Sequence, residues 1–242
     1  MIPNAANRND HMGGEGFVEG ALEKGNHGRE DRTAGGWRKG KVWRVARVVF
    51  IGLELIACCF GGESADEKSW RVWLEPRSSH APVTLPIAGA ERTEVCAGFM
   101  EEAGPRAMTK EELAAMGIEM EKFAARAREN AAADLAKLKP RYVRNAQRVI
   151  EYAELRSARP VVAGVVLAPK FLALFRETLG EKVLVVVPNR FTAYVFPALA
   201  GAHADYAPMV LAALGATAWP VSVELFEVST DGVRCVGRYA EP

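Results

Sequence analysis

The length, composition and charge of the chain set the first limits on its class. It has 242 residues, with 31 Lys and Arg against 30 Asp and Glu, so its formal net charge is only +1. Basic residues are dispersed along the part after Phe60, so the concentrated positive surface of a nucleic-acid-binding protein is missing. The remaining 182 residues (242 − 60) are enough for one domain with a sizeable core.

The first 37 residues differ in composition from the rest. Residues 1–37 are rich in Gly, Asn, Glu and Arg, and their few apolar side chains follow neither a helical nor a strand period. Such a segment cannot bury enough apolar surface to offset the entropy lost on ordering. We interpret it as a disordered tail or as a spurious extension upstream of the true start.

Residues 38–62 have the pattern of an export signal. Basic residues come first, an apolar stretch follows at 48–57, and Leu55-Ile56-Ala57-Cys58 resembles a lipobox. A Cys in that position receives a diacylglycerol and anchors the protein without spanning the bilayer. The uninterrupted apolar piece, 48–53, is far shorter than the roughly 20 residues of a transmembrane helix. This predicts a secreted or cell-envelope protein, with Cys58 as a lipidation site and no spanning helix.

Two features leave the opposite interpretation open. Glu54 interrupts the apolar stretch, and a carboxylate is costly in lipid; a bacterial signal also rarely starts so far into a chain. Either the true start lies near Val42 or Val45, or the segment is a buried helix of a cytoplasmic protein in which Cys58 and Cys59 are small buried thiols.

Cysteine and histidine are scarce in the globular part, residues 63–242. Cys96 and Cys235 are the only candidates for a structural disulfide there. His80 and His203 are its only histidines, and no Cys-x-x-Cys occurs, so the spacing of a zinc site is missing. We expect neither a metal nor another cofactor.

The globular part begins with a pattern of strands. Residues 70–74, WRVWL, alternate as in a strand, and 75–79 have the composition of a turn. Further extended pieces are predicted at 82–87 and 91–99.

One long helix is then expected. Thr109 and Glu112 have capping-box spacing, and apolar residues recur at three and four positions through Met120, Phe123, Ala124, Ala127, Ala131, Leu135 and Leu138. Pro140 should end the helix because it lacks the donor for the next hydrogen bond.

The rest of the chain uses a helix followed by two strands three times. The long helix precedes strands at 148–155 and 161–167; a helix at 169–179 precedes strands at 182–187 and 191–196; a helix at 206–214 precedes strands at 221–228 and 233–239. Short turns between strands favour hairpins. This predicts a single α+β domain with a largely antiparallel sheet and helices packed on it. The middle hairpin is apolar on both faces, so both faces should be covered; the last hairpin should lie nearer the sheet edge or have one face in contact with water.

The turn of the middle hairpin is the sharpest candidate site. Asn189 and Arg190 could present an amide and a guanidinium to an anionic or carboxylate ligand. The alternative is structural: Pro188 and Asn189 suit a turn, and Arg190 would pair with a nearby acid.

His203 and Asp205 form a second candidate. A histidine beside a carboxylate could act as an oriented base. Asp205 is equally suited to cap the helix that follows.

The run at 180–200, GEKVLVVVPNRFTAYVFPALA, resembles a bacterial family known only as a domain of unknown function. WRVWLEP and EYAELRS are also similar to segments of uncharacterised proteins. The resemblance covers about 70–239, implies the fold, and brings no catalytic residues with it.

Two functional hypotheses follow. The first is a non-enzymatic exported or membrane-anchored domain that binds a protein partner or a small ligand near Asn189 and Arg190. The alternative is a cytosolic hydrolase or transferase in which Asn189, Arg190, His203 and Asp205 face one pocket.

Overall fold

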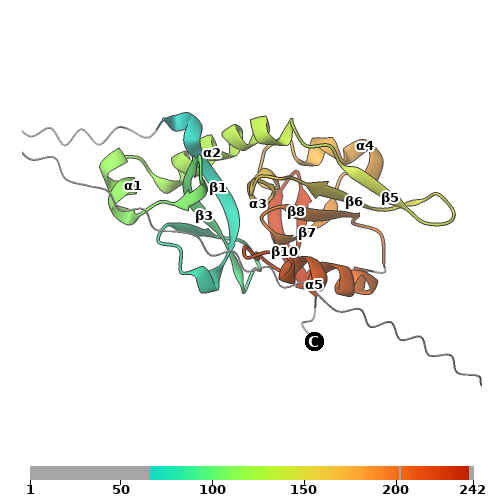
Figure 1. The fold of residues 1–242 in the computed structure, drawn as a ribbon. Coiled ribbons are helices and arrows are strands. Elements are labelled where there is room, and N and C mark those ends of the chain that lie inside the picture. Colours follow the sequence, from blue (N-terminus) through green and yellow to red (C-terminus); the bar gives the residue numbers. More distant parts are fainter. Residues whose placement is uncertain (1–65, 202, 240–242) are drawn as a thin grey trace, which may run out of the picture. The chain divides into compact units, whose positions relative to one another are not determined.

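The described residues form ten strands and five α-helices arranged as two sheets with helices on both sides (Figure 1). The structure is a computed structural model that describes residues 66–201 and 203–239. The predicted tail at 1–37 and the predicted export segment with Cys58 lie outside this part. The architecture is α+β, as predicted. No helix in the described ranges is long and apolar enough to cross a membrane.

The first sheet is built around one long strand. β3 (Thr93–Glu101) pairs with β1 (Trp70–Pro76) along one edge, while β2 (Thr84–Pro86) and β4 (Gly104–Ala107) share its other edge. All these pairs are antiparallel. The strands expected near 70–74 and 91–99 are confirmed, and the extended piece at 82–87 contains β2.

The second sheet consists of three hairpins side by side in the order β10-β9-β7-β8-β6-β5. Its strands are β5 (Arg141–Arg144), β6 (Ile150–Arg156), β7 (Val183–Asn189), β8 (Thr192–Pro197), β9 (Glu224–Ser229) and β10 (Gly232–Arg238). Every neighbouring pair is antiparallel. A helix followed by a hairpin recurs three times, as predicted, but the first hairpin is β5 with β6 and not the predicted pair at 148–155 and 161–167.

One predicted strand is wrong. Residues 161–167 are not a strand but contain the short helix α3 (Val162–Val165), and β5 is the true partner of β6. A short apolar run does not distinguish a buried helix from a buried strand. The segment packs closely on β1, since a Cβ on Gly164 would lie only 2.8 Å from the carbonyl oxygen of Val72.

The predicted long helix is in fact two helices. Thr109 and Glu112 form the expected capping box at the start of α1 (Lys110–Met116), but Gly117, with a φ of 64°, ends it. The left-handed conformation that glycine tolerates breaks the helix there. α2 (Met120–Leu135) follows and ends five residues before Pro140 (140 − 135).

The other helices are short. The expected helix at 169–179 consists of a 3₁₀ turn, Leu172–Leu174, and α4 (Arg176–Leu179). Further 3₁₀ turns lie at Glu67–Ser69, Arg77–Ser79 and His203–Tyr206. α5 (Ala207–Gly215) agrees with the prediction at 206–214.

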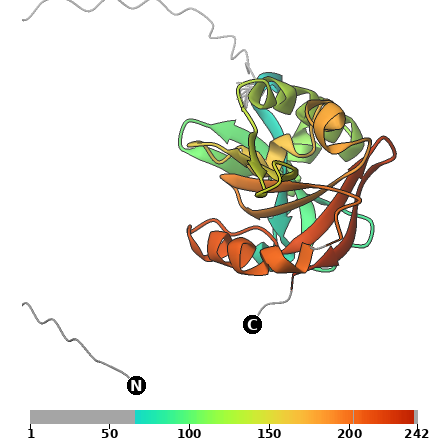
Figure 2. The same ribbon diagram turned by 90° about the vertical axis from the view of Figure 1, so that its right-hand side faces the viewer.

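Two cores cover the two faces of the second sheet. Val183, Val185 and Val187 of β7 face the larger core, which they share with the first sheet, α2 and α3, whereas Leu184 and Val186 face the smaller core under α5. Figures 1 and 2 show α2 and α5 on opposite sides of the second sheet. The middle hairpin is therefore covered on both faces, as predicted, and β10 is a mostly exposed edge strand.

A loop of the first sheet is fastened to the last hairpin of the second. The backbone N–H of Cys235 donates to the carbonyl of Ala88 (2.8 Å). Oε1 of Glu224, whose side chain is buried, accepts the backbone N–H groups of Glu91 (2.8 Å) and Arg92 (3.1 Å). These bonds hold the end of β2 close to β10 and so fix one wall of the pocket described below.

Candidate functional site

Asn189 holds the turn of the middle hairpin from inside. The residue is 2% exposed. Nδ2 donates to the carbonyl of Ala213 in α5 (2.7 Å), and Oδ1 accepts the backbone N–H of Phe191 (2.9 Å). Both ends of the amide thus have protein partners, which ties the turn to α5.

Arg190 lies in a cluster with Glu75, Trp73 and Trp219, which we call the Arg190 cluster. Its guanidinium donates to Oε2 of Glu75 (2.6 Å), and Nε1 of Trp73 donates to the same oxygen (2.7 Å). The guanidinium carbon lies 4.7 Å from the ring centre of Trp219 and 5.5 Å from that of Trp73. The cation is therefore paired and stacked, and it links the hairpin to β1 of the other sheet.

A shallow depression lies beside the Arg190 cluster. It has a volume of about 380 Å³ and is lined by Arg190, Glu75, Trp219 and neighbouring Pro and Ser side chains. A carboxylate ligand entering here would compete with Glu75 for the guanidinium. This geometry favours the structural interpretation of the turn.

His203 and Asp205 lie away from this cluster. The His203 ring packs on Phe196 with 5.5 Å between ring centres, its Nδ1 is buried without a hydrogen bond, and burial lowers the pKa of its imidazole. Phe196 is near the far end of β8 from Arg190, roughly 20 Å along an extended strand at about 3.3 Å per residue. The structure does not bring the four residues of the enzyme hypothesis into one pocket.

Asp205 also lacks the structural role predicted for it. It is exposed and lies within the 3₁₀ turn His203–Tyr206. The N-cap of α5 is Tyr206, which makes no side-chain capping bond. The capping prediction is wrong because the 3₁₀ turn moves the start of α5 past Asp205.

The two cysteines of the described part are free. Cys96 is buried and donates to the carbonyl of Ala97, whereas Cys235 lies on edge strand β10 and donates to Gly237. Burial raises the pKa of the Cys96 thiol to about 12. They do not form the disulfide considered from the sequence, and the Cys96 thiol is a poor nucleophile. Within the described ranges no three His, Cys, Asp or Glu residues are grouped to hold a metal ion.

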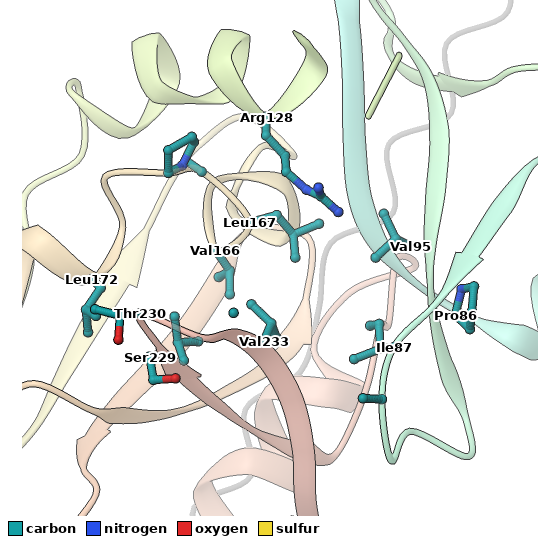
Figure 3. A pocket seen from close by; sticks show the side chains of 15 residues that line it. Pro86, Ile87, Val95, Arg128, Val166, Leu167, Leu172, Ser229, Thr230 and Val233 are labelled. Atoms are coloured by element: carbon teal, nitrogen blue, oxygen red, sulfur yellow. The ribbon is translucent and has the colours of Figure 1, made fainter. Parts of the chain in front are cut away.

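A different place offers a deeper pocket (Figure 3). It lies between the first sheet, the segment after α3 and the last hairpin, with α2 above, and has a volume of about 370 Å³. Its walls come from Pro86, Ile87, Ala88 and Val95 of the first sheet, from 166–169 and Leu172, and from Val228, Ser229, Thr230, Gly232 and Val233. This volume falls in the range of small-molecule sites. We call it the Arg128 pocket.

Arg128 is the one charged side chain in the lining of this pocket as described. It extends from α2 toward the apolar side chains below (Figure 3). Three arginines of the described part are half-buried: Arg71, which pairs with Asp134, Arg190, which pairs with Glu75, and Arg128. Of these three, Arg128 alone makes neither a hydrogen bond nor an ion pair with its side chain in residues 66–201 and 203–239.

The unpartnered guanidinium is the chemical feature of the pocket. A half-buried charge is normally paired, because desolvation without a partner is unfavourable. Here the other side chains of the lining are aliphatic, apart from the hydroxyls of Ser229 and Thr230. The arrangement can therefore attract an anionic group while its walls accept an apolar body.

Arg128 was missed at the sequence level although a signal was present. It lies four residues after Ala124 and three before Ala131, on the apolar stripe of the helix, where a charged residue is unexpected. The pocket beneath it could not be found in the same way, since its walls come from segments distant in the chain.

Comparison with known proteins gives no further guide to the site. No family model, no curated protein and no solved structure matches this chain. The resemblance of 180–200 to a bacterial family stays a prediction.

Proposed function

We propose that residues 66–239 form a binding domain that takes a small molecule with an apolar body and an anionic group into the Arg128 pocket. The observation that carries the proposal is the half-buried residue Arg128, whose guanidinium has no partner among the described residues and lines a pocket with aliphatic side chains. Attraction between opposite charges is stronger in such a place than in water.

The composition of the lining supports binding rather than chemistry. General acid-base catalysis needs a titratable group within hydrogen-bond reach of the reacting atoms. The lining, as far as the structure describes it, offers Arg128 and two hydroxyls but no His, Cys, Asp, Glu or Lys.

Export and lipid attachment are separate parts of the proposal. A signal at 38–62 and a lipid on Cys58 would place the binding domain in the cell envelope. The mature N-terminal mass and cell fractionation test this part, and a soluble cytosolic protein that retains 48–57 would contradict it.

The binding proposal is tested by thermal shift on the full 242-residue chain. The anionic probes are benzoate, cyclohexanecarboxylate, octanoate and hexyl phosphate. Hexylamine is the cationic control and hexanol the uncharged one. At least one anion should raise the melting temperature in a saturable manner, because a ligand of the native state stabilises it by mass action.

Two variants show whether such binding occurs in the pocket. Ala168→Leu fills it from a buried wall, and Thr230→Trp fills it from an exposed position at the rim. Both should abolish the shift while melting cooperatively. If no anion raises the melting temperature of the wild type, or if both variants show the same shift as the wild type, the proposed function is overturned.

A further inference from the structure

The lining of the Arg128 pocket also indicates the class of ligand. Resting on the proposed function, we infer that the ligand is a linear aliphatic monocarboxylate, with its carboxylate on Arg128 and its chain between the two sheets. Three properties of the lining carry this inference: the number of cations, the kind of apolar side chain and the size.

The charge of the pocket favours a carboxylate head. A guanidinium offers two parallel N–H donors that match both oxygens of a carboxylate. A phosphate monoester carries nearly two negative charges and would call for a second cation. The lining, within residues 66–201 and 203–239, includes no other Arg or Lys.

The walls favour an aliphatic chain. Val95, Val166, Leu172 and Val228 all line the pocket, and the described lining includes no Phe, Tyr, Trp or His. Aromatic ligands and nucleobases gain much of their specific stabilisation from stacking on such rings. A flexible alkyl chain needs only aliphatic contact, and removing it from water supplies the driving force.

The size sets an upper limit on the chain. A volume of about 370 Å³, divided by the roughly 30 Å³ that one small molecule such as water occupies, corresponds to about 12 non-hydrogen atoms. This is the size of decanoate. Hexadecanoate would have to leave part of its chain outside.

The experiment is isothermal titration of the full chain with butanoate, hexanoate, octanoate, decanoate and hexadecanoate. Each added methylene should tighten binding about fourfold up to the limit of the pocket, after which the gain should stop. Decanol should bind at least about tenfold more weakly than decanoate, because a charge-assisted hydrogen bond is lost.

Variants of Arg128 assign the head group. Arg128→Gln should weaken decanoate binding about tenfold or more, and Arg128→Lys should weaken it less, because lysine keeps the charge but not the fork. Arg159→Gln is the matched control, since Arg159 is exposed and its side chain has no partner in the described part. It should bind as the wild type does.

The outcomes separate this inference from the proposed function. If benzoate or hexyl phosphate binds in the pocket but decanoate does not, the ligand class is wrong and the binding function stands. If decanol binds as tightly as decanoate, or Arg128→Gln leaves the affinity unchanged, the role of the guanidinium is refuted. If no probe binds, both proposals fail.

Discussion

Phe123 is the position at which truncation tests the packing of α2 most directly. Its side chain is fully buried. Its ring is stacked on Trp70 with 4.8 Å between ring centres and meets Phe99 edge-on at 6.3 Å. Both partners lie in the first sheet, so the ring fastens α2 to that sheet.

Phe123→Ala should lower the free energy of unfolding by about 3–5 kcal/mol, as expected for a large side chain deleted from a core. Phe123→Leu keeps most of the volume and should lose only the aromatic contacts, about 0.5–1.5 kcal/mol for each ring pair. Lys122→Ala is the control on the same helix, because Lys122 is 76% exposed and pairs only with exposed Glu119. It should change stability by less than about 0.5 kcal/mol.

The assay is urea unfolding of the full chain, followed by tryptophan fluorescence and far-ultraviolet circular dichroism. A loss below about 1 kcal/mol for Phe123→Ala, far under the range for a buried aromatic residue, would refute the packing of α2 on the first sheet.

Three further predictions concern other contacts. Gly164→Ala should lower the free energy of unfolding by about 1–3 kcal/mol in the same assay, since its Cβ would lie 2.8 Å from a backbone oxygen of β1. Gly215→Ala is the control and should be neutral or stabilising, because a Cβ there meets nothing within 4 Å. Equal effects of the two substitutions would contradict the close approach at Gly164. Arg190→Met should lower the free energy of unfolding by about 3 kcal/mol, because it leaves the buried Glu75 carboxylate without its cation. Arg190→Lys should lower it less. An unchanged free energy of unfolding in the methionine variant would show that the ion pair contributes nothing to stability. The lowered pKa of His203 means that the unfolded chain binds its proton more readily, so stability should fall as the pH drops through the unfolded pKa of about 6.5. His203→Gln should flatten that part of the pH–stability curve, and an unchanged curve would contradict the burial of the imidazole.

The candidate sites show how far residue patterns alone can lead. The turn at Asn189 and Arg190 was identified from its composition, with a structural and a binding interpretation both open. Its buried partners, Glu75 and Ala213, are far away in the chain, and no local pattern names them. His203 and Asp205 lie in the same 3₁₀ turn, yet the buried Nδ1 of His203 has no hydrogen-bond partner among the described residues.

Local pattern determined the secondary structure wherever a single period ran long enough to be recognised. The apolar stripe of α2, the capping box at Thr109 and the twice-covered strands of the middle hairpin all follow from short-range spacing, because side-chain direction repeats regularly along a helix or a strand. The antiparallel sheet followed from the short turns, which leave no room for a crossover.

Only the tertiary structure decided the rest. The run at 161–167 is apolar enough for a strand or a helix, and only the structure shows that it contains the helix α3, which packs closely on β1 at Gly164. The Arg128 pocket likewise exists only where the first sheet, α2 and the last hairpin meet. Such contacts join residues that are distant in the chain, and the free energy that selects them comes from burial and close packing between elements, which short-range spacing does not encode.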